Sequence, residues 1–95
     1  GINSVEEEPE IADKISVYPN PANKKASLTL QPREASEMNI SLIDLHGSEL
    51  QQIHNGLLTT EMHKFDIMTE NLSSGTYFIH ITNAKGSSVE KLIVE

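Results

Sequence analysis

The chain has 95 residues, which is enough for one domain but too few for two separate hydrophobic cores. Its 14 acidic side chains outnumber its 7 lysines and arginines, and the formal charge of −7 argues against nucleic-acid binding and against electrostatic attachment to anionic lipid, because both need basic surfaces. No apolar run approaches the roughly 18 residues of a membrane span, so direct membrane insertion is not expected. The absence of cysteine excludes disulfides and thiolate chemistry.

The first 13 residues carry five acidic side chains and no basic one. The acidic run from Glu6 to Glu10 repels itself, and Pro9 interrupts any helix there. We therefore interpret residues 1–13 as an acidic flexible linker and residues 14–95 as the folded domain. There is no initiating Met and no signal peptide, which indicates a domain excised or processed from a longer protein.

After the linker, short alternations of apolar and polar residues are separated by turn residues, a pattern typical of β-strands. In chain order, the alternating apolar residues are Ile15 and Val17; Leu28 and Leu30; Met38, Ile40 and Leu42; Leu50 and Ile53; Phe65 and Ile67; Tyr77, Ile79 and Ile81; and Val89 to Val94. The strands are expected to start near residues 15, 27, 38, 49, 61, 76 and 88. About seven strands at this spacing predict an all-β fold, an Ig-like antiparallel β-sandwich. The stretches between them are too short for helical crossovers.

The corner before the sixth strand carries a more specific signal. In Ig-like sandwiches a tyrosine near the start of this strand hydrogen-bonds back to the preceding corner. Tyr77 is in that position, and Gly75 is expected to supply a positive φ. The alternative is that Tyr77 is an ordinary half-buried aromatic of the strand. Both interpretations give this residue a structural role.

Polar side chains that could form an active site are not grouped in the sequence. No serine lies in a nucleophile elbow, and Asp44 and Asp66 are interpreted as turn or strand-edge residues. The histidines lack the paired spacing of compact metal motifs: His46, His54, His63 and His80. We therefore predict that the protein is not an enzyme and has no catalytic residues, metal site or cofactor.

The final segment, Val89 to Glu95, has two interpretations. It is either the routine last strand of the sandwich or a strand displayed to a partner. A displayed strand would be recognised through its end or by addition of another strand along its edge.

Four motifs, taken together, resemble a known family. Val17–Ala22 (Val-Tyr-Pro-Asn-Pro-Ala) is similar to the entry signature of the C-terminal sorting domains of the type IX (Por) secretion system. Leu42–Gly47 resembles the family's Asp-Leu-x-Gly hairpin, Leu72–Ile79 resembles its Leu-x-x-Gly-x-Tyr strand, and Lys91–Val94 resembles its closing strand. The motifs occur in the family's order between residues 17 and 94.

This resemblance implies that the chain is a secretion signal domain. It would direct a cargo protein across the outer membrane, from the periplasm in transit to the cell surface or the exterior. Its implied partners are the type IX translocon and a sortase-like protease that cuts the linker, at or before residues 1–13. The residues assigned to partner recognition by resemblance are Tyr18, Pro19, Asn20, Pro21, Gly75, Tyr77, Lys91, Leu92, Ile93, Val94 and Glu95.

An alternative function is an Ig-like adhesion or carbohydrate-binding module of a cell-surface protein. Sugar-binding platforms usually present exposed aromatic rings. Only Phe78 is an obvious outward aromatic, so this alternative has less support.

Overall fold

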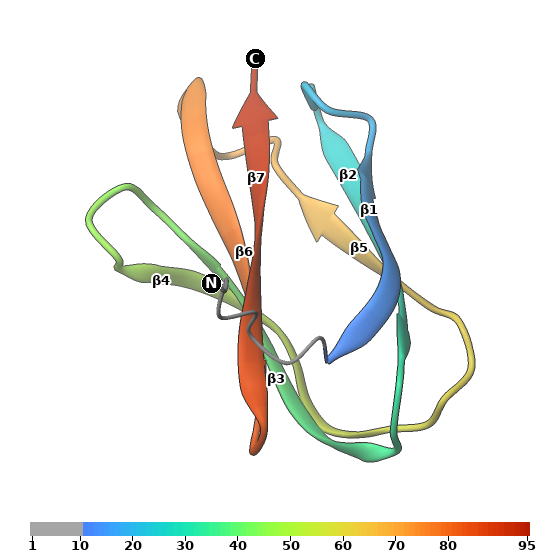
Figure 1. Ribbon diagram of the computed structural model, residues 1–95. Coiled ribbons are helices and arrows are strands. Elements are labelled where there is room, and N and C mark those ends of the chain that lie inside the picture. The colour runs from blue at the N-terminus through green and yellow to red at the C-terminus, as the bar shows by residue number, and fades with distance from the viewer. Residues whose placement is uncertain (1–10) are drawn as a thin grey trace, which may run out of the picture.

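The computed structural model describes residues 11–95, which form two antiparallel sheets facing each other (Figure 1). The strands are β1 (Ala12–Tyr18), β2 (Lys25–Pro32), β3 (Ser36–Ile43), β4 (Glu49–Leu58), β5 (His63–Met68), β6 (Gly75–Asn83) and β7 (Gly86–Val94). The predicted all-β sandwich of seven strands is confirmed.

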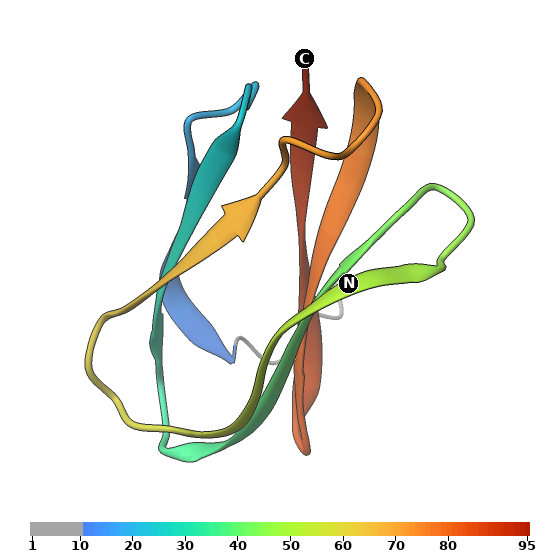
Figure 2. The ribbon, with the colours of Figure 1, turned by 180° about the vertical axis from the view of Figure 1, so that it is seen from behind.

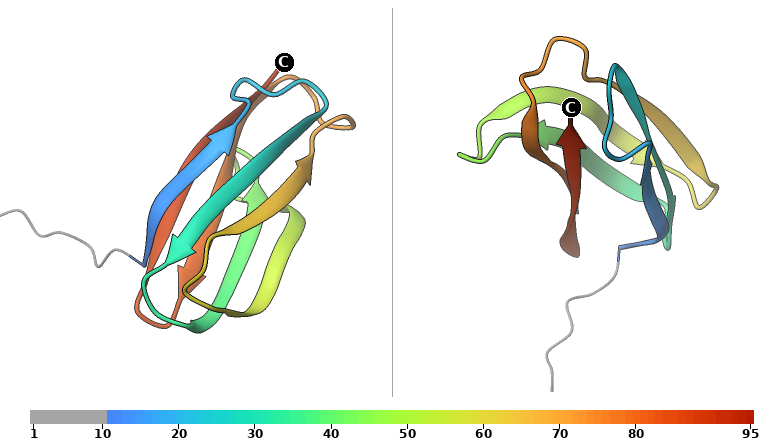
Figure 3. Two further views of the ribbon diagram at one scale, coloured as in Figure 1. Left: turned by 90° about the vertical axis from the view of Figure 1, so that its right-hand side faces the viewer. Right: turned by 90° about the horizontal axis from the view of Figure 1, so that it is seen from above.

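One sheet has three strands in the order β1-β2-β5, and the other has four in the order β4-β3-β6-β7. The view from above in Figure 3 shows the two sheets as separate layers. The sandwich edge formed by β1 and β7 faces the viewer in Figure 1, and the edge formed by β4 and β5 faces the viewer in Figure 2. The last strand is therefore an edge strand of the larger sheet.

The core lies between the sheets and follows from the alternation of the strands. Every second side chain of β2, β3, β6 and the end of β7 points inward, because successive residues of a strand face opposite sides. The fully buried large apolar side chains are Leu28, Leu30, Met38, Ile40, Leu42, Ile67, Ile79, Ile81 and Leu92. Each contributes on the order of 1.5–3 kcal/mol when removed from water.

The first strand begins earlier than the sequence indicated. β1 starts at Ala12 rather than near Ile15, and Ile11 and Ala12 are both buried. The strand has a bulge beside Lys14, whose φ is 55°, and this irregularity breaks the alternation on which the prediction depended. Of the expected linker, residues 1–10 lie outside the described part of the chain.

Candidate functional site

The segment after β1 lies against the last strand, at the end of the sandwich where β7 finishes (Figure 3). The side-chain amide of Asn20 is bonded twice to β7. Its Nδ2 donates to the carbonyl oxygen of Lys91 at 2.9 Å, and its Oδ1 accepts from the backbone N–H of Ile93 at 2.9 Å. One asparagine thus substitutes for a neighbouring strand, because an amide offers both a donor and an acceptor.

Ala22 continues this contact with its backbone. Its N–H donates to the carbonyl oxygen of Ile93 at 2.7 Å, and its carbonyl oxygen accepts from the N–H of Glu95 at 2.9 Å. We call these contacts of Asn20 and Ala22 the edge clamp. The clamp pairs the outward backbone groups of β7 from Lys91 to Glu95, so another strand cannot add along this stretch without displacing it.

The proline motif of the clamp segment has a simple chemical consequence. Pro19 and Pro21 have no N–H to donate, so the bonds to β7 come from the Asn20 side chain and the Ala22 backbone. Both X-Pro peptide bonds, Tyr18-Pro19 and Asn20-Pro21, are cis. The Tyr18 side chain is 77% exposed, and both prolines are exposed.

Tyr77 forms the corner that the sequence predicted. Its hydroxyl donates to the carbonyl oxygen of Ser73 at 2.7 Å, while its ring is buried against the core. Gly75 has a φ of 154°, in the positive range expected of it. The hydrogen-bonded corner is therefore confirmed, and it fixes the start of β6 beside the end of β7.

Thr69 is a structural residue of this end that sequence reasoning missed. It is 1% exposed, its N–H donates to the carbonyl oxygen of Lys24 at 2.9 Å, and its hydroxyl donates to that of Asn23 at 3.3 Å. These bonds join the β5–β6 connection to the segment that carries the clamp. No local sequence signal marks this contact, because the partners are more than 40 residues apart.

The last strand divides the residues assigned to recognition into two groups. Leu92 and Val94 are buried in the core, whereas Lys91 and Glu95 are exposed and Ile93 is half-buried on the opposite face. A partner that meets the folded domain can therefore contact the second group but not the first.

The turn between β3 and β4 is held by Asp44. Its Oδ1 accepts from the backbone N–H groups of Ser48 and His46, both at 2.9 Å, and the Ser48 bond is the main cause that lowers the pKa of this carboxyl. Gly47 has a φ of 84°. The interpretation of Asp44 as a turn residue is confirmed. A hollow of about 210 Å³ lies between this turn and residues 74–77.

Other candidate chemistry is sparse between residues 11 and 95. In that range no three or more His, Cys, Asp or Glu side chains are arranged to hold a metal ion. The imidazoles of His54 and His63 lie against the ring of Phe65, with centroid separations of 5.2 and 6.4 Å. Phe78 points outward as expected, although it is half-buried. The expectation that no other aromatic is obviously outward was wrong, because Tyr18 is 77% exposed.

A search of residues 11–95 finds no helix that is long and apolar enough to cross a membrane.

Comparison with known proteins identifies the family. The family model described as the secretion system C-terminal sorting domain matches residues 16–95. The chain therefore belongs to this family of type IX (Por) sorting domains, as the sequence motifs indicated. The family is one of sorting signals rather than enzymes.

Among solved structures, the fold is similar to part of PorZ, which is described as an essential bacterial surface component of the type-IX secretion system of human oral-microbiomic Porphyromonas gingivalis. The TM-score is 0.63 with 21% sequence identity, a level that establishes similarity of fold. The match covers 87% of this chain and only 12% of the PorZ chain. No curated protein matches the chain.

Proposed function

We propose that this chain is a C-terminal secretion signal domain that directs its cargo across the outer membrane through the type IX secretion system. The observation that carries the proposal is the family match over residues 16–95. The domain would act by being bound, first by the translocon and then by a sortase-like protease, and would catalyse nothing itself. Its cargo would pass through the periplasm and finish at the cell surface or outside the cell.

The edge clamp supports the proposal that residues of the family motifs have two different roles, shaping the domain or contacting a partner. Asn20, Gly75 and Tyr77 build the shape of the domain through hydrogen bonds and backbone conformation. The groups that a partner could contact on this end are Tyr18, Pro19, Pro21, and the outward side chains of β7, Lys91, Ile93 and Glu95. In this proposal the buried Leu92 and Val94 act indirectly, by holding β7 in place.

Processing belongs to the other end of the chain. We propose that the protease cuts in, or before, the acidic segment 1–13. A protease needs an extended backbone in its active site. Because Ile11 and Ala12 are packed into the fold, we place the cut within this range before Ile11. Cleavage before Ile11 would leave the described domain intact.

The proposal is tested by fusing residues 1–95 behind a periplasmic reporter in a bacterium that has a working type IX system. We expect the reporter at the cell surface, with its C-terminus, measured by mass spectrometry, in or before residues 1–13. The matched control is the same fusion in an isogenic strain without the translocon, where the reporter should stay in the periplasm. A reporter confined to the periplasm in both strains would contradict the proposal.

A further inference from the structure

The outer face of the four-stranded sheet has an apolar cluster beside the clamped half of β7. Residues paired directly across neighbouring strands share a face, and the pairs Ile43–Phe78, Phe78–Lys91 and Thr76–Ile93 place these side chains outward. We call Ile43, Phe78 and Ile93 the outer apolar cluster. Farther along the same face the pairs become polar, as in Asn39–Thr82.

The outer face of the three-stranded sheet is different. It carries several hydroxyls and charges that bond to one another: the Ser16 and Thr29 hydroxyls are 2.8 Å apart, and Ser27 donates to Asp66 at 3.3 Å. Lys64 is exposed on the same face, opposite Thr29. The exposed Tyr18 and Met68 on this face are paired with the polar Ser27 and Lys25. In the outer apolar cluster, by contrast, Ile43 and Phe78 are paired directly with each other.

Few groups at the end of β7 are available for contact with a partner. Its inward side chains, Leu92 and Val94, are buried, and its backbone edge is paired with the edge clamp. Only the outward side chains are left for contact, and these stand beside Phe78 on the outer face. A partner that recognises the end of β7 in the intact fold would therefore use this face.

Lys91 places a positive charge on this outer face. It is exposed at the border of the cluster and forms no ion pair with another residue of the described range. A partner that covers the cluster would bring an acidic group near this ammonium group. Opposite charges at the rim of an apolar contact guide encounter and fix orientation.

We propose, on the basis of the proposed function, that a folded protein of the export machinery docks on the outer apolar cluster with an apolar patch bordered by a carboxylate that meets Lys91. A protein surface fits better than the other occupants. A single lysine in a chain of charge −7 attracts anionic lipid weakly, and two copies of such a chain repel each other.

The test uses the reporter fusion in the competent host with two separate substitutions. Phe78→Thr removes the ring but keeps a residue that favours strands, and Lys91→Glu reverses the charge of an exposed side chain. We expect each to lower the surface reporter about tenfold. Phe78 lies within the proposed contact, and Lys91→Glu would set two like charges against each other at its rim.

Each substitution has a matched control. Leu57→Thr removes an apolar side chain that is 60% exposed at the far end of the same sheet. Lys64→Glu makes the same charge change on the outer face of the three-stranded sheet. Both controls should keep the surface reporter within about twofold of the unsubstituted fusion, because neither residue lies beside the outer apolar cluster. Circular dichroism of the purified chains verifies folding, and Lys91→Glu carries the test if Phe78→Thr unfolds.

The outcomes separate this inference from the proposed function. An unsubstituted fusion that never reaches the surface would reject the proposed function itself. Export at normal levels by both Phe78→Thr and Lys91→Glu would reject only the docking face, as would equal losses in the two controls. If sedimentation instead shows a dimer that Lys91→Glu dissociates, the face belongs to a second copy of this chain and the proposal is overturned.

Discussion

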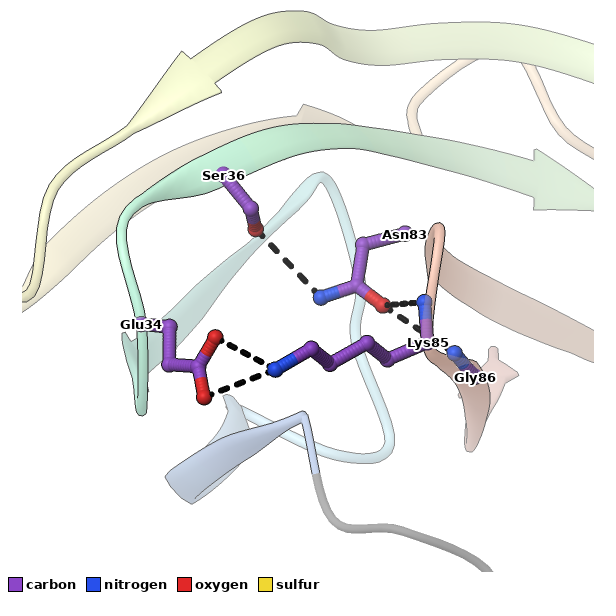
Figure 4. Close-up of polar contacts among 5 residues, drawn as sticks. All are labelled: Glu34, Ser36, Asn83, Lys85 and Gly86. Carbon is purple, nitrogen blue, oxygen red and sulfur yellow. Dashed lines mark hydrogen bonds and ion pairs between the residues drawn. The ribbon is translucent and has the colours of Figure 1, made fainter.

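The two ends of the sandwich are fastened by different kinds of contact. At the end where β7 finishes, side chains such as Asn20 and Tyr77 bond to backbone groups of segments that must stay in place. At the opposite end the turn between β6 and β7 meets the connection before β3 mainly through exposed polar side chains (Figure 4). Substitutions at the end where β7 finishes should therefore lower the free energy of unfolding more than substitutions at the opposite end.

Figure 4 shows the contacts of the second end in detail. Lys85 Nζ lies 2.7 and 2.9 Å from the two carboxylate oxygens of Glu34, and both side chains are about two-thirds exposed. Asn83 shapes the turn itself, because its Oδ1 accepts from the N–H groups of Lys85 at 2.8 Å and Gly86 at 3.1 Å. Water can replace most of these bonds, so their loss should cost little.

The largest expected effect is at the edge clamp. Asn20→Ala removes two hydrogen bonds to the backbone of β7, and at about 0.5–1.5 kcal/mol each the free energy of unfolding should fall by roughly 1–3 kcal/mol. Urea unfolding measures this change. Hydrogen exchange should also show faster exchange of the Ile93 amide. The matched control is Asn23→Ala, three residues along and exposed, which keeps its backbone carbonyl and should change stability by less than about 0.5 kcal/mol. Equal losses in the two variants would show that the clamp does not stabilise the end of β7.

The second effect concerns the tyrosine corner. Tyr77→Phe keeps the buried ring but removes the hydroxyl that donates to Ser73, so unfolding should become easier by about 0.5–1.5 kcal/mol. Tyr18→Phe makes the same chemical change on a side chain that is 77% exposed and should leave the unfolding midpoint unchanged. If both variants behave alike, the corner hydrogen bond contributes nothing measurable.

The sequence predicted the elements that depend on neighbouring residues. The alternation of Ile79 and Ile81, the turn at Asp44 and the corner at Tyr77 are all encoded within a few positions, and the structure confirms them. The edge clamp joins Asn20 to Lys91 and Ile93, which lie 71 and 73 positions later in the chain. No local sequence pattern shows such a pairing.

Irregular backbone also limited the prediction. The bulge beside Lys14 concealed the start of β1, because it shifts the side chains before it relative to those after it. The family motifs identified Tyr18 to Pro21 and the last strand as important. They could not show that the two touch, or that Leu92 and Val94 are inaccessible to a partner.

The third effect tests the weakly fastened end. A double-mutant cycle with Lys85→Ala and Glu34→Ala should give a coupling energy of about 0.2–1 kcal/mol, as for other exposed ion pairs. The coupling should diminish in molar salt, because both charges are exposed to solvent and mobile ions screen exposed ion pairs. A coupling as large as the loss from Asn20→Ala, or one that salt leaves unchanged, would remove the distinction between the two ends.

The smallest expected effect on stability is at Glu90 in β7, next to the clamped part of the strand. From Lys91 onward the strand edge is clamped, but no strand of the described chain pairs with the edge from Gly86 to Glu90. Glu90 pairs with the buried Ile79 and thus points inward, and an inward charge at an open edge discourages the addition of another strand. This protection carries a stability cost, since partial burial raises the pKa of the Glu90 carboxyl.

The effect of ionised Glu90 on stability can be tested by measuring unfolding at different pH values. A raised pKa means that the folded state holds the proton more tightly than the unfolded state, so ionised Glu90 destabilises the fold above its folded pKa, and the loss is relieved as pH falls through that value. Glu90→Gln should therefore raise the thermal midpoint slightly at neutral pH, and its advantage should disappear in acid. Glu70→Gln makes the same change on an exposed side chain and is the control, which should leave the thermal midpoint at neutral pH nearly unchanged. A Glu90→Gln variant that is less stable than the natural sequence at neutral pH would mean that the carboxylate has a stabilising partner. A higher thermal midpoint of Glu90→Gln accompanied by new self-association in sedimentation would support the interpretation that the Glu90 charge prevents another strand from adding to the unclamped edge.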